Sequence, residues 1–561
     1  MANIPARERA APGAAASRWS GYAAYAAPAI FLAFAATLAP WAFDFPLNDD
    51  WAYASAARTL AETGRLALSD WGSATQVPHL LWGALFVKLF GFSFGALRAA
   101  NLLAAAAALS VFVKLLEECG AEPAESLLAA LALAFSPLFL VLSNSFMTDV
   151  HYLLWMLAAS LFYVRRIKDP GNTRAILLAG ACAGAAYLTR QLGLALPLAF
   201  TAVQLARKRF GIREAALTWA PPGAAILGYY LWFNYVHGPT WASENYVGAA
   251  TLSHLAKIGP FLAGSLFRSF AALMESGLLL LPPAAGLALC FRQFSGKNGF
   301  KRRVTPGLPW LALIGLGLFA AFNGSLPYLE NSLSSSGLGT LTLGGAALKP
   351  SGIFASPAFW YAATAVSAAS AALLLCAGDL ALRAGGPELR FFFVSAALHF
   401  GISLLGAKFF DRYLLTLLPW FAAAAAFAAG RLKFSRPAAW TALAFFALLG
   451  WAGEKDYLAW NAAKWELATR PHQDLPAEDI VNGFDYEAWY NYGRNMAYLK
   501  SMKPLRLIGE WEWQKFTGYR AIVSYARDPR FKLLDEAEYS TPLSGSKGVL
   551  YLMELPRPAR Q

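Results

Sequence analysis

The stretch Phe45-Pro-Leu-Asn-Asp-Asp-Trp-Ala-Tyr-Ala54 joins a long apolar segment to a short alanine-rich one. The apolar segment, about residues 22–43, is long enough to cross a membrane, which takes about 20 residues. Asp49 and Asp50 should therefore lie just outside the bilayer. Residues 51–62 have the periodicity of an amphipathic helix. The sequence thus predicts two adjacent carboxylates at the start of a helix on the membrane surface.

Helix capping is a simpler role for these acids. Asn48 or Asp49 can cap the helix through a side-chain oxygen, and acidic residues are favoured in a first turn. Taken alone, this stretch favours capping. A chemical role depends on what the rest of the chain places beside it.

The composition excludes a soluble globular protein. The 561 residues are 57% hydrophobic and only 14% charged, which is typical of a polytopic membrane protein. The net charge of +13 does not indicate a nucleic-acid partner, because most Lys and Arg residues fall in short loops between apolar runs. The first apolar run is too long for a signal peptide, so we expect it to remain as a helix. The four cysteines are expected to be buried thiols rather than disulfides.

The fold predicted is a polytopic α-helical membrane protein with about thirteen transmembrane helices and a small α/β domain at its C-terminus. With the N-terminus in the cytoplasm, the basic loops 206–213, 291–303, 383–390 and 431–436 fall inside. The first three helices are expected near residues 22–43, 97–116 and 126–142, and a fourth follows Asp149 and ends near Arg165. Two short helices are expected within 175–205. The others are expected near residues 215–236, 261–291, 306–322, 357–382, 391–407, 414–429 and 437–452.

Two domains are expected, a transmembrane domain over residues 1–453 and a soluble domain over 454–561 on the outer side. Residues 520–525 and 548–555 of the tail have strand-like alternation. The outer loop 323–355 is rich in Gly and Ser, which predicts a flexible cover or a binding loop. No cofactor is expected, and a divalent metal is possible but not indicated by any cluster of ligands in the sequence.

Four polar groups fall on the predicted outer side of the membrane. Each has a structural alternative: Asp149 can cap a helix, Arg190 can extend its charge to the interface, and Arg412 can be an interfacial anchor. Together they place acids and bases at the ends of neighbouring helices in a chain otherwise poor in charge. The groups are Asp49 with Asp50, Asp149 with His151, Arg190 with Gln191, and Lys408 with Asp411, Arg412 and Tyr413.

Acids and cations at a membrane face suit the transfer of a sugar from a lipid phosphate. The acceptor hydroxyl needs a carboxylate to take its proton. The departing phosphate needs Arg or Lys to stabilise its growing charge. The lipid tail needs an apolar cleft that opens to the bilayer.

The chain resembles the GT-C membrane glycosyltransferases, in particular the superfamily of protein O-mannosyltransferases and lipid A aminoarabinose transferases. Asn48-Asp-Asp-Trp-Ala-Tyr53 is similar to the first outer loop of that family, and Phe146-Met-Thr-Asp149 to its second acidic motif. Leu188-Thr-Arg-Gln-Leu-Gly-Leu194 and Phe410-Asp-Arg-Tyr-Leu-Leu-Thr-Leu-Leu-Pro419 are similar to later segments. The resemblance extends to about Trp451.

The resemblance implies that Asp49 is the catalytic carboxylate, Asp149 a second acid of the site, and Arg412 a contact to the donor phosphate. Relatives often carry Asp-Glu where this chain has Asp49-Asp50, so either acid could be the base. The full set expected is Asp49, Asp50 and Asp149 as catalytic residues, Arg412, Lys408 and Arg190 at the donor phosphate, and Tyr53, His151 and Tyr413 in the substrate pocket, with no metal.

The function predicted is sugar transfer from a polyprenyl-phosphate donor to a lipid, glycan or protein acceptor. The enzyme would lie in a bacterial inner membrane, among membrane lipids, with its site facing the periplasm and with inversion at the anomeric carbon. The alternative is a transporter or lipid flippase, but the ionisable groups gather at one face rather than near the midplane. A third possibility is a sugar-binding or assembly protein that has lost catalysis.

Overall fold

The computed structural model describes residues 14–244, 257–290, 315–317, 329, 331–343, 348–406, 408–472, 474–501 and 518–555. The expected helix at 306–322 lies outside the described residues except for 315–317, and the basic loop 291–303 lies wholly outside them.

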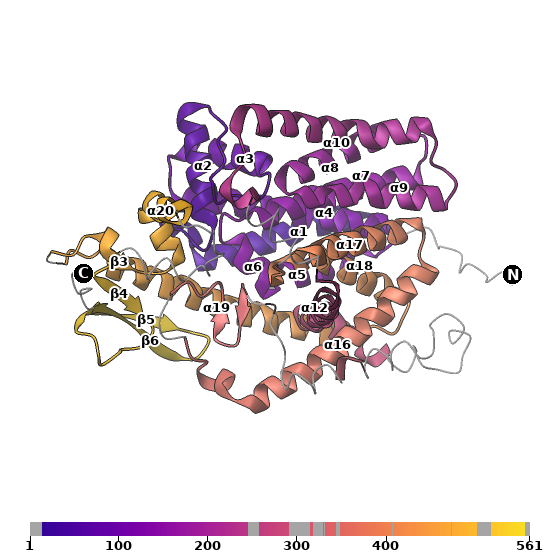
Figure 1. The fold of residues 1–561 in the computed structure, drawn as a ribbon. Helices are drawn as coiled ribbons and strands as arrows, with labels where there is room; N and C mark the ends of the chain where they lie inside the picture. Colours follow the sequence, from indigo (N-terminus) through magenta and orange to yellow (C-terminus); the bar gives the residue numbers. More distant parts are fainter. Residues whose placement is uncertain are drawn as a thin grey trace.

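The first half of the chain forms a layer of long helices that run side by side (Figure 1). Short 3₁₀ turns, η1 (Pro40–Ala42) and η2 (Gln191–Leu194), interrupt it, and a π turn, η3 (Phe233–His237), ends it. The helices are α1 (Ala14–Leu38), α2 (Asp50–Thr63), α3 (Val77–Phe90), α4 (Phe94–Glu118), α5 (Pro123–Ala134), α6 (Pro137–Ser143), α7 (Thr148–Lys168), α8 (Thr173–Thr189), α9 (Ala195–Ala206) and α10 (Ile212–Trp232).

The second half adds a further group of helices against this layer (Figure 1). They are α12 (Ile258–Leu279), α13 (Leu281–Leu287), α16 (Pro357–Ala384), α17 (Pro387–Leu405), α18 (Leu418–Ala429) and α19 (Arg436–Thr469), with the 3₁₀ segments η5 (Ala288–Cys290), η7 (Gly352–Ala355) and η8 (Asp411–Thr416). Most boundaries fall within a few residues of those expected from hydropathy.

Two helices expected to be continuous are broken. Residues 126–142 form α5 and α6, which meet at 66°, and residues 261–291 form α12 and α13, which meet at 78°. At the first break Pro137 begins the new helix and the Ser136 hydroxyl accepts the N–H of Phe139 at 3.3 Å. At the second break Pro282 and Pro283 follow Leu280. Proline lacks an N–H and clashes with the preceding turn, which hydropathy does not register.

Among the described residues, three helices are long and apolar enough to cross a membrane, namely α4, α16 and α17. The number rises to five if each bent pair, α5 with α6 and α12 with α13, counts as one span. The structure therefore shows a mostly helical, multi-pass chain. The expected total of about thirteen spans stays a prediction.

The C-terminal part forms a four-stranded mixed sheet and the helix α20 (Phe484–Ser501). The strands are β3 (Ile480–Val481), β4 (Ala521–Ser524), β5 (Leu533–Thr541) and β6 (Ser546–Glu554), in the order β3-β4-β6-β5. The pair β3 and β4 is parallel, and the other pairs are antiparallel. A 3₁₀ turn, η9 (Ala477–Asp479), precedes β3. Both tail segments expected to be strands are strands.

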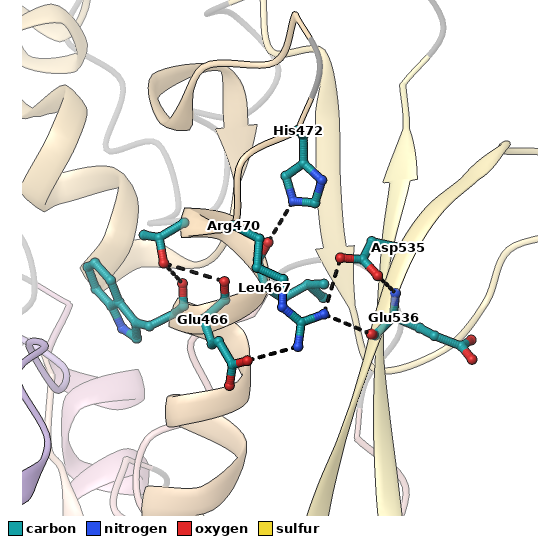
Figure 2. A network of polar contacts seen from close by, with 8 residues as sticks. Glu466, Leu467, Arg470, His472, Asp535 and Glu536 are labelled. Atoms are coloured by element: carbon teal, nitrogen blue, oxygen red, sulfur yellow. Dashed lines mark hydrogen bonds and ion pairs between the residues drawn. The ribbon is translucent and has the colours of Figure 1, made fainter.

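One unbroken helix, α19, joins this sheet to the helical layers and passes through the expected domain boundary at 453/454. Arg470 fastens its end to β5 (Figure 2). The guanidinium bonds Glu466 at 2.9 Å, Asp535 at 3.2 Å and the carbonyl of Glu536 at 3.3 Å. His472 also contacts the carbonyl of Leu467 at 2.8 Å. The sheet is therefore held directly on the end of a helix.

Residues 331–343 lie in the loop that is expected to be a flexible cover or a binding loop, and they form a short hairpin. It contains β1 (Leu333–Ser334) and β2 (Gly337–Leu338), which pair antiparallel. The Asp411 carboxylate accepts the N–H groups of Ser332 and Leu333 at 2.6 and 2.7 Å. Asp411 is buried. This member of the fourth polar group thus has a structural role.

Ion pairs between helix ends gather where the expected cytoplasmic loops lie. Arg166 at the end of α7 bonds both oxygens of Glu214 on α10, at 3.1 and 2.5 Å. Arg436 at the start of α19 bonds Glu125 on α5 at 2.6 Å. Glu118 pairs with Arg165 and Lys168. Several basic residues near the loops expected to be cytoplasmic therefore join helices.

The contact between α12 and α16 gives a test of the packing. A Cβ added at Gly277 would lie 2.3 Å from the Ser367 carbonyl and 2.7 Å from the Ala371 amide, both backbone atoms that cannot move alone. We expect Gly277→Ala to destabilise the protein by about 1–3 kcal/mol through overpacking. A Cβ at Gly264 on the same helix meets nothing within 4 Å. Melting temperatures in detergent should therefore fall for Gly277→Ala and not for Gly264→Ala.

Candidate active site

The loop between α1 and α2 is held by Arg98, which lies on α4 and is fully buried. Its guanidinium donates to the carbonyls of Pro40, Phe43 and Phe45. Three backbone carbonyls of the loop thus share two nitrogens of one buried guanidinium, whose Nε has no hydrogen-bond partner among the described residues. The course of this loop fixes where the two acids of the first motif lie.

Asp49 and Asp50 occupy different environments although they are adjacent. Asp50 is buried, and its two oxygens accept the N–H groups of Leu47 at 2.7 Å and Phe146 at 3.2 Å. Asp49 keeps 18% of its side chain exposed. It is the N-cap residue of α2, but its carboxylate makes no capping hydrogen bond. Its Oδ1 instead accepts the indole N–H of Trp71 at 3.0 Å.

Arg412, in η8, brings the fourth polar group to Asp49. One of its nitrogens, Nη1, lies 3.6 Å from Oδ2 of Asp49, an ion pair longer than a hydrogen bond. Arg412 is only 9% exposed, and its Nε and Nη1 donate no hydrogen bond within the part of the chain that the structure describes. Its guanidinium therefore has unused donor capacity in a buried place.

A second ion pair joins the other two polar groups. Arg190, between α8 and η2, donates to Oδ1 of Asp149 at 2.6 Å. Asp149 is buried near the start of α7, where Met147 is the N-cap residue, and its Oδ2 has no hydrogen-bond partner among the described residues. Its carboxylate is therefore paired with an arginine rather than used as a helix cap.

Aromatic side chains connect the two pairs. The Tyr413 ring lies 5.7 Å from the Arg190 guanidinium and 6.0 Å from that of Arg412, within cation–π range. Tyr53 on α2 is buried, and burial followed by the charge of Asp49 raises the pKa of its hydroxyl, while the charges of Arg412 and Arg190 oppose the shift. Tyr53 thus responds to charges from both pairs.

Two histidines, His79 and His151, pack on the side of Tyr53. His79 on α3 contacts the Tyr53 ring edge-on at 5.6 Å and stacks on Phe146 at 4.0 Å. His151 lies 4.7 Å from His79, measured between ring centroids. Both are buried, and Nε2 of His151 has no hydrogen-bond partner within the described ranges. Lys408, in contrast, is exposed four residues before Arg412.

The sequence reasoning missed three residues that build this site: Arg98, Trp71 and His79. Arg98 gave a signal, since it is a lone charge at the start of an apolar helix. Trp71 and His79 lie in stretches with no family motif, and only the folded chain brings them to Asp49 and Tyr53.

The fold and the site together define a class: a multi-pass membrane protein with paired acids and arginines at one end of its helices. Residues 77–230 match the family model described as dolichyl-phosphate-mannose-protein mannosyltransferase. This match confirms the resemblance to membrane glycosyltransferases of the GT-C type. It covers Asp149, His151 and Arg190 but neither Asp49 nor Arg412.

Solved structures also align with the chain. The crystal structure of ArnT from Cupriavidus metallidurans bound to undecaprenyl phosphate aligns with a TM-score of 0.37 at 12% identity, over 93% of this chain and 97% of that chain. The apo form of the same protein aligns with a TM-score of 0.36 at 13% identity, over the same shares of the two chains. No curated protein matches the chain.

The buried acid gives a pH prediction. Burial raises the pKa of Asp50 from 3.8 to about 7, so between these values the folded protein holds a proton that the unfolded chain releases. Stability from the protonated form is present below about pH 4 and is lost as the pH rises through 7. The three-unit difference corresponds to at most about 4 kcal/mol.

Asp50→Asn has nothing to titrate and should flatten this part of the profile. Between pH 5 and pH 8 the melting temperature of wild type should fall more than that of Asp50→Asn. The two melting temperatures should therefore converge as the pH rises. Parallel profiles would contradict the assignment of Asp50 as a buried, mostly protonated acid.

Proposed function

We propose that this protein transfers a sugar from a polyprenyl-phosphate-linked donor to a lipid, glycan or protein acceptor, at the outer face of a bacterial inner membrane. The proposal is supported by the family match over residues 77–230 and by the composition of the site. We assign the transmembrane part, residues 1–453, to catalysis, and residues 454–561 to an outer domain that completes the site.

The observation that carries the proposal is the state of Arg412. A buried guanidinium whose Nε and Nη1 donate no hydrogen bond within the described chain carries a desolvation cost that a bound anion would relieve. The planar fork of arginine matches phosphate oxygens in a bidentate way. Arg412 therefore suits the phosphate of the donor, with Arg190 as a second cation close by.

We assign the general base to Asp49 rather than Asp50. Both oxygens of Asp50 are used by backbone N–H groups, and its side chain is buried. Asp49 is partly exposed and lies beside Arg412. In the proposed reaction Asp49 takes the proton of the acceptor hydroxyl, whose oxygen bonds the anomeric carbon. The bond from that carbon to the phosphate oxygen breaks at the same time, and polyprenyl phosphate leaves with inverted stereochemistry in the product.

The remaining predicted residues are assigned to binding. Asp149 holds Arg190 in place and keeps one oxygen for the substrate. Tyr53 and Tyr413 lie between the charged pairs and can border the sugar, and His151 lies behind them. Lys408 is exposed, so it would contact the donor phosphate only while the donor enters the site.

An apolar cavity of about 340 Å³ supports a lipid-linked donor. It lies between α12, α16, α17 and α18, and most of its lining is apolar, including Leu417, Trp420 and Phe421. Its wall residue Phe400 contacts Phe409 at 5.7 Å, and Phe409 contacts Tyr413 at 5.7 Å. A row of contacting aromatic rings therefore separates the cavity from Tyr413, whose ring lies within cation–π range of both arginines.

Replacing Asp49 tests the assignment of the base. Asp49→Asn should lower transfer by about 10²–10⁴-fold because the amide cannot accept the proton. Its melting temperature should stay near wild type, because the carboxylate makes no capping bond. Asp50→Asn is the matched control: it should lose stability and keep measurable transfer. Near wild-type turnover of Asp49→Asn in purified enzyme would remove Asp49 from the chemistry.

The donor class is tested by offering purified enzyme a polyprenyl-phosphate sugar or the matching nucleotide sugar, with an acceptor extract. We expect transfer only from the lipid-linked donor. Arg412→Lys keeps the charge but loses the bidentate contact, so kcat/KM for that donor should fall about 10-fold or more. Transfer from the nucleotide sugar alone would overturn the donor class. No transfer from either donor would favour the transporter alternative.

A further inference from the structure

Trp71 is the side chain that holds the proposed base. Its indole N–H donates to Oδ1 of Asp49 at 3.0 Å, which leaves Oδ2 on the side of Arg412. An indole N–H can only donate, so Oδ1 of Asp49 must be the acceptor of this bond. The contact therefore favours the ionised form of Asp49 and one orientation of its two oxygens.

The backbone on both sides of Trp71 is fastened to the segment that follows η3. The amide of Ala242 donates to the carbonyl of Asp70 at 2.9 Å, and the hydroxyl of Thr240 donates to the carbonyl of Gly72 at 2.8 Å. These bonds place the Trp241 ring parallel to the Trp71 ring, with centroids 5.9 Å apart and planes 8° apart. One contact of the indole ring is thus set by the helical part of the chain.

Another contact comes from the C-terminal part. The Phe484 ring, at the first residue of α20, lies 5.3 Å from the Trp71 ring. It also meets Trp51 of α2 edge-on at 6.3 Å. Figure 1 shows α20 beside α2, at the same end of the molecule as the sheet. The C-terminal part therefore contacts Trp71, the residue that donates a hydrogen bond to the proposed base Asp49.

Phe484 has little freedom to move. Gly483 adopts a φ of +91°, which L side chains rarely adopt, and an added Cβ would lie 2.8 Å from the Thr342 carbonyl. That carbonyl accepts the N–H of Phe484 at 3.2 Å. The next residue, Asp485, bonds Lys464 of α19 through both oxygens at 2.7 Å, and both side chains are fully buried. The start of α20 is thus anchored to the outer hairpin and to α19.

We propose that Trp71 is a positioning residue for Asp49 and that the C-terminal part, through Phe484, holds Trp71 in place. The inference rests on the proposed function, since it assigns to the C-terminal part a role in the chemistry of that site. The C-terminal part is then neither a tether nor a separate binding module. It supplies a wall that keeps an N–H group aimed at the base.

The test of Trp71 is the pH dependence of kcat/KM in detergent-purified full-length enzyme. Trp71→Phe keeps the ring and removes the N–H. The acid limb of the profile should move up by about one pH unit, because the carboxylate loses a donor that favoured its charged form. The value of kcat should fall several-fold at neutral pH, with the KM for the donor little changed.

Trp82→Phe is the matched control. Its indole N–H donates to the carbonyl of Ala100 at 2.9 Å, and Trp82 takes no part in the site. Its profile should superimpose on that of wild type. A Trp71→Phe profile that also superimposes on wild type would overturn the role of Trp71. If wild type itself transfers no sugar from a polyprenyl-phosphate donor, the proposed function fails instead.

The role of the C-terminal part is tested separately with Phe484→Leu and Phe484→Tyr. Leucine removes the ring that meets Trp71, so the acid limb should shift in the same direction as in Trp71→Phe, by a smaller amount. Tyrosine keeps the ring and should restore the wild-type profile. Identical profiles for Phe484→Leu and wild type would overturn the link to α20. The two Phe484 variants also cover the case in which Trp71→Phe fails to fold.

Discussion

The site depends on one fully buried cation, Arg98. Arg98 holds the carbonyls of Pro40, Phe43 and Phe45, and the loop that leaves α1 therefore has a single course. The same loop is tied to the start of α4 again, where Asp44 accepts the N–H of Phe94 at 2.7 Å. Asp50 continues the chain of bonds to Phe146, three residues before Asp149. Asp50 and Asp149, which lie 99 positions apart in sequence, are thus placed by one polar network.

The buried charges at the two ends of the helices differ in the partners they have. At the loops expected to be cytoplasmic, Arg166 bonds both oxygens of Glu214 and joins two neighbouring helices, although its Nη1 has no hydrogen-bond partner in the described chain. At the site, within the same described ranges, Arg412 lacks a hydrogen-bond partner at two nitrogens, Nε and Nη1, and Asp149 lacks one at Oδ2. Two unpartnered donors on one buried guanidinium are suited to receive an anionic ligand.

Hydropathy and periodicity predicted most of the described apolar helices, because burial in apolar surroundings is what those patterns record, but they gave no signal for α20. They were insufficient at Pro137 and Pro282, where a local backbone effect bends a helix without changing its hydrophobicity. Motifs identified Asp49, Asp149, Arg190 and Arg412, and the structure brings these together in two pairs. Nothing in the motif could separate Asp49 from Asp50, because their difference lies in partners supplied by distant segments. The contact of Trp71 with Asp49 depends on the same long-range folding.

The length of α19 restricts how the protein can change. Its 34 residues span about 51 Å, against about 30 Å for the hydrocarbon layer of a membrane. One rigid rod therefore runs from the ion pair of Arg436 with Glu125 to the sheet held by Arg470. Inserting a single residue into this rod would turn everything beyond it by about 100°. The C-terminal part can therefore vary in its loops and strands over evolutionary time, while the number of residues in α19 is expected to stay constant.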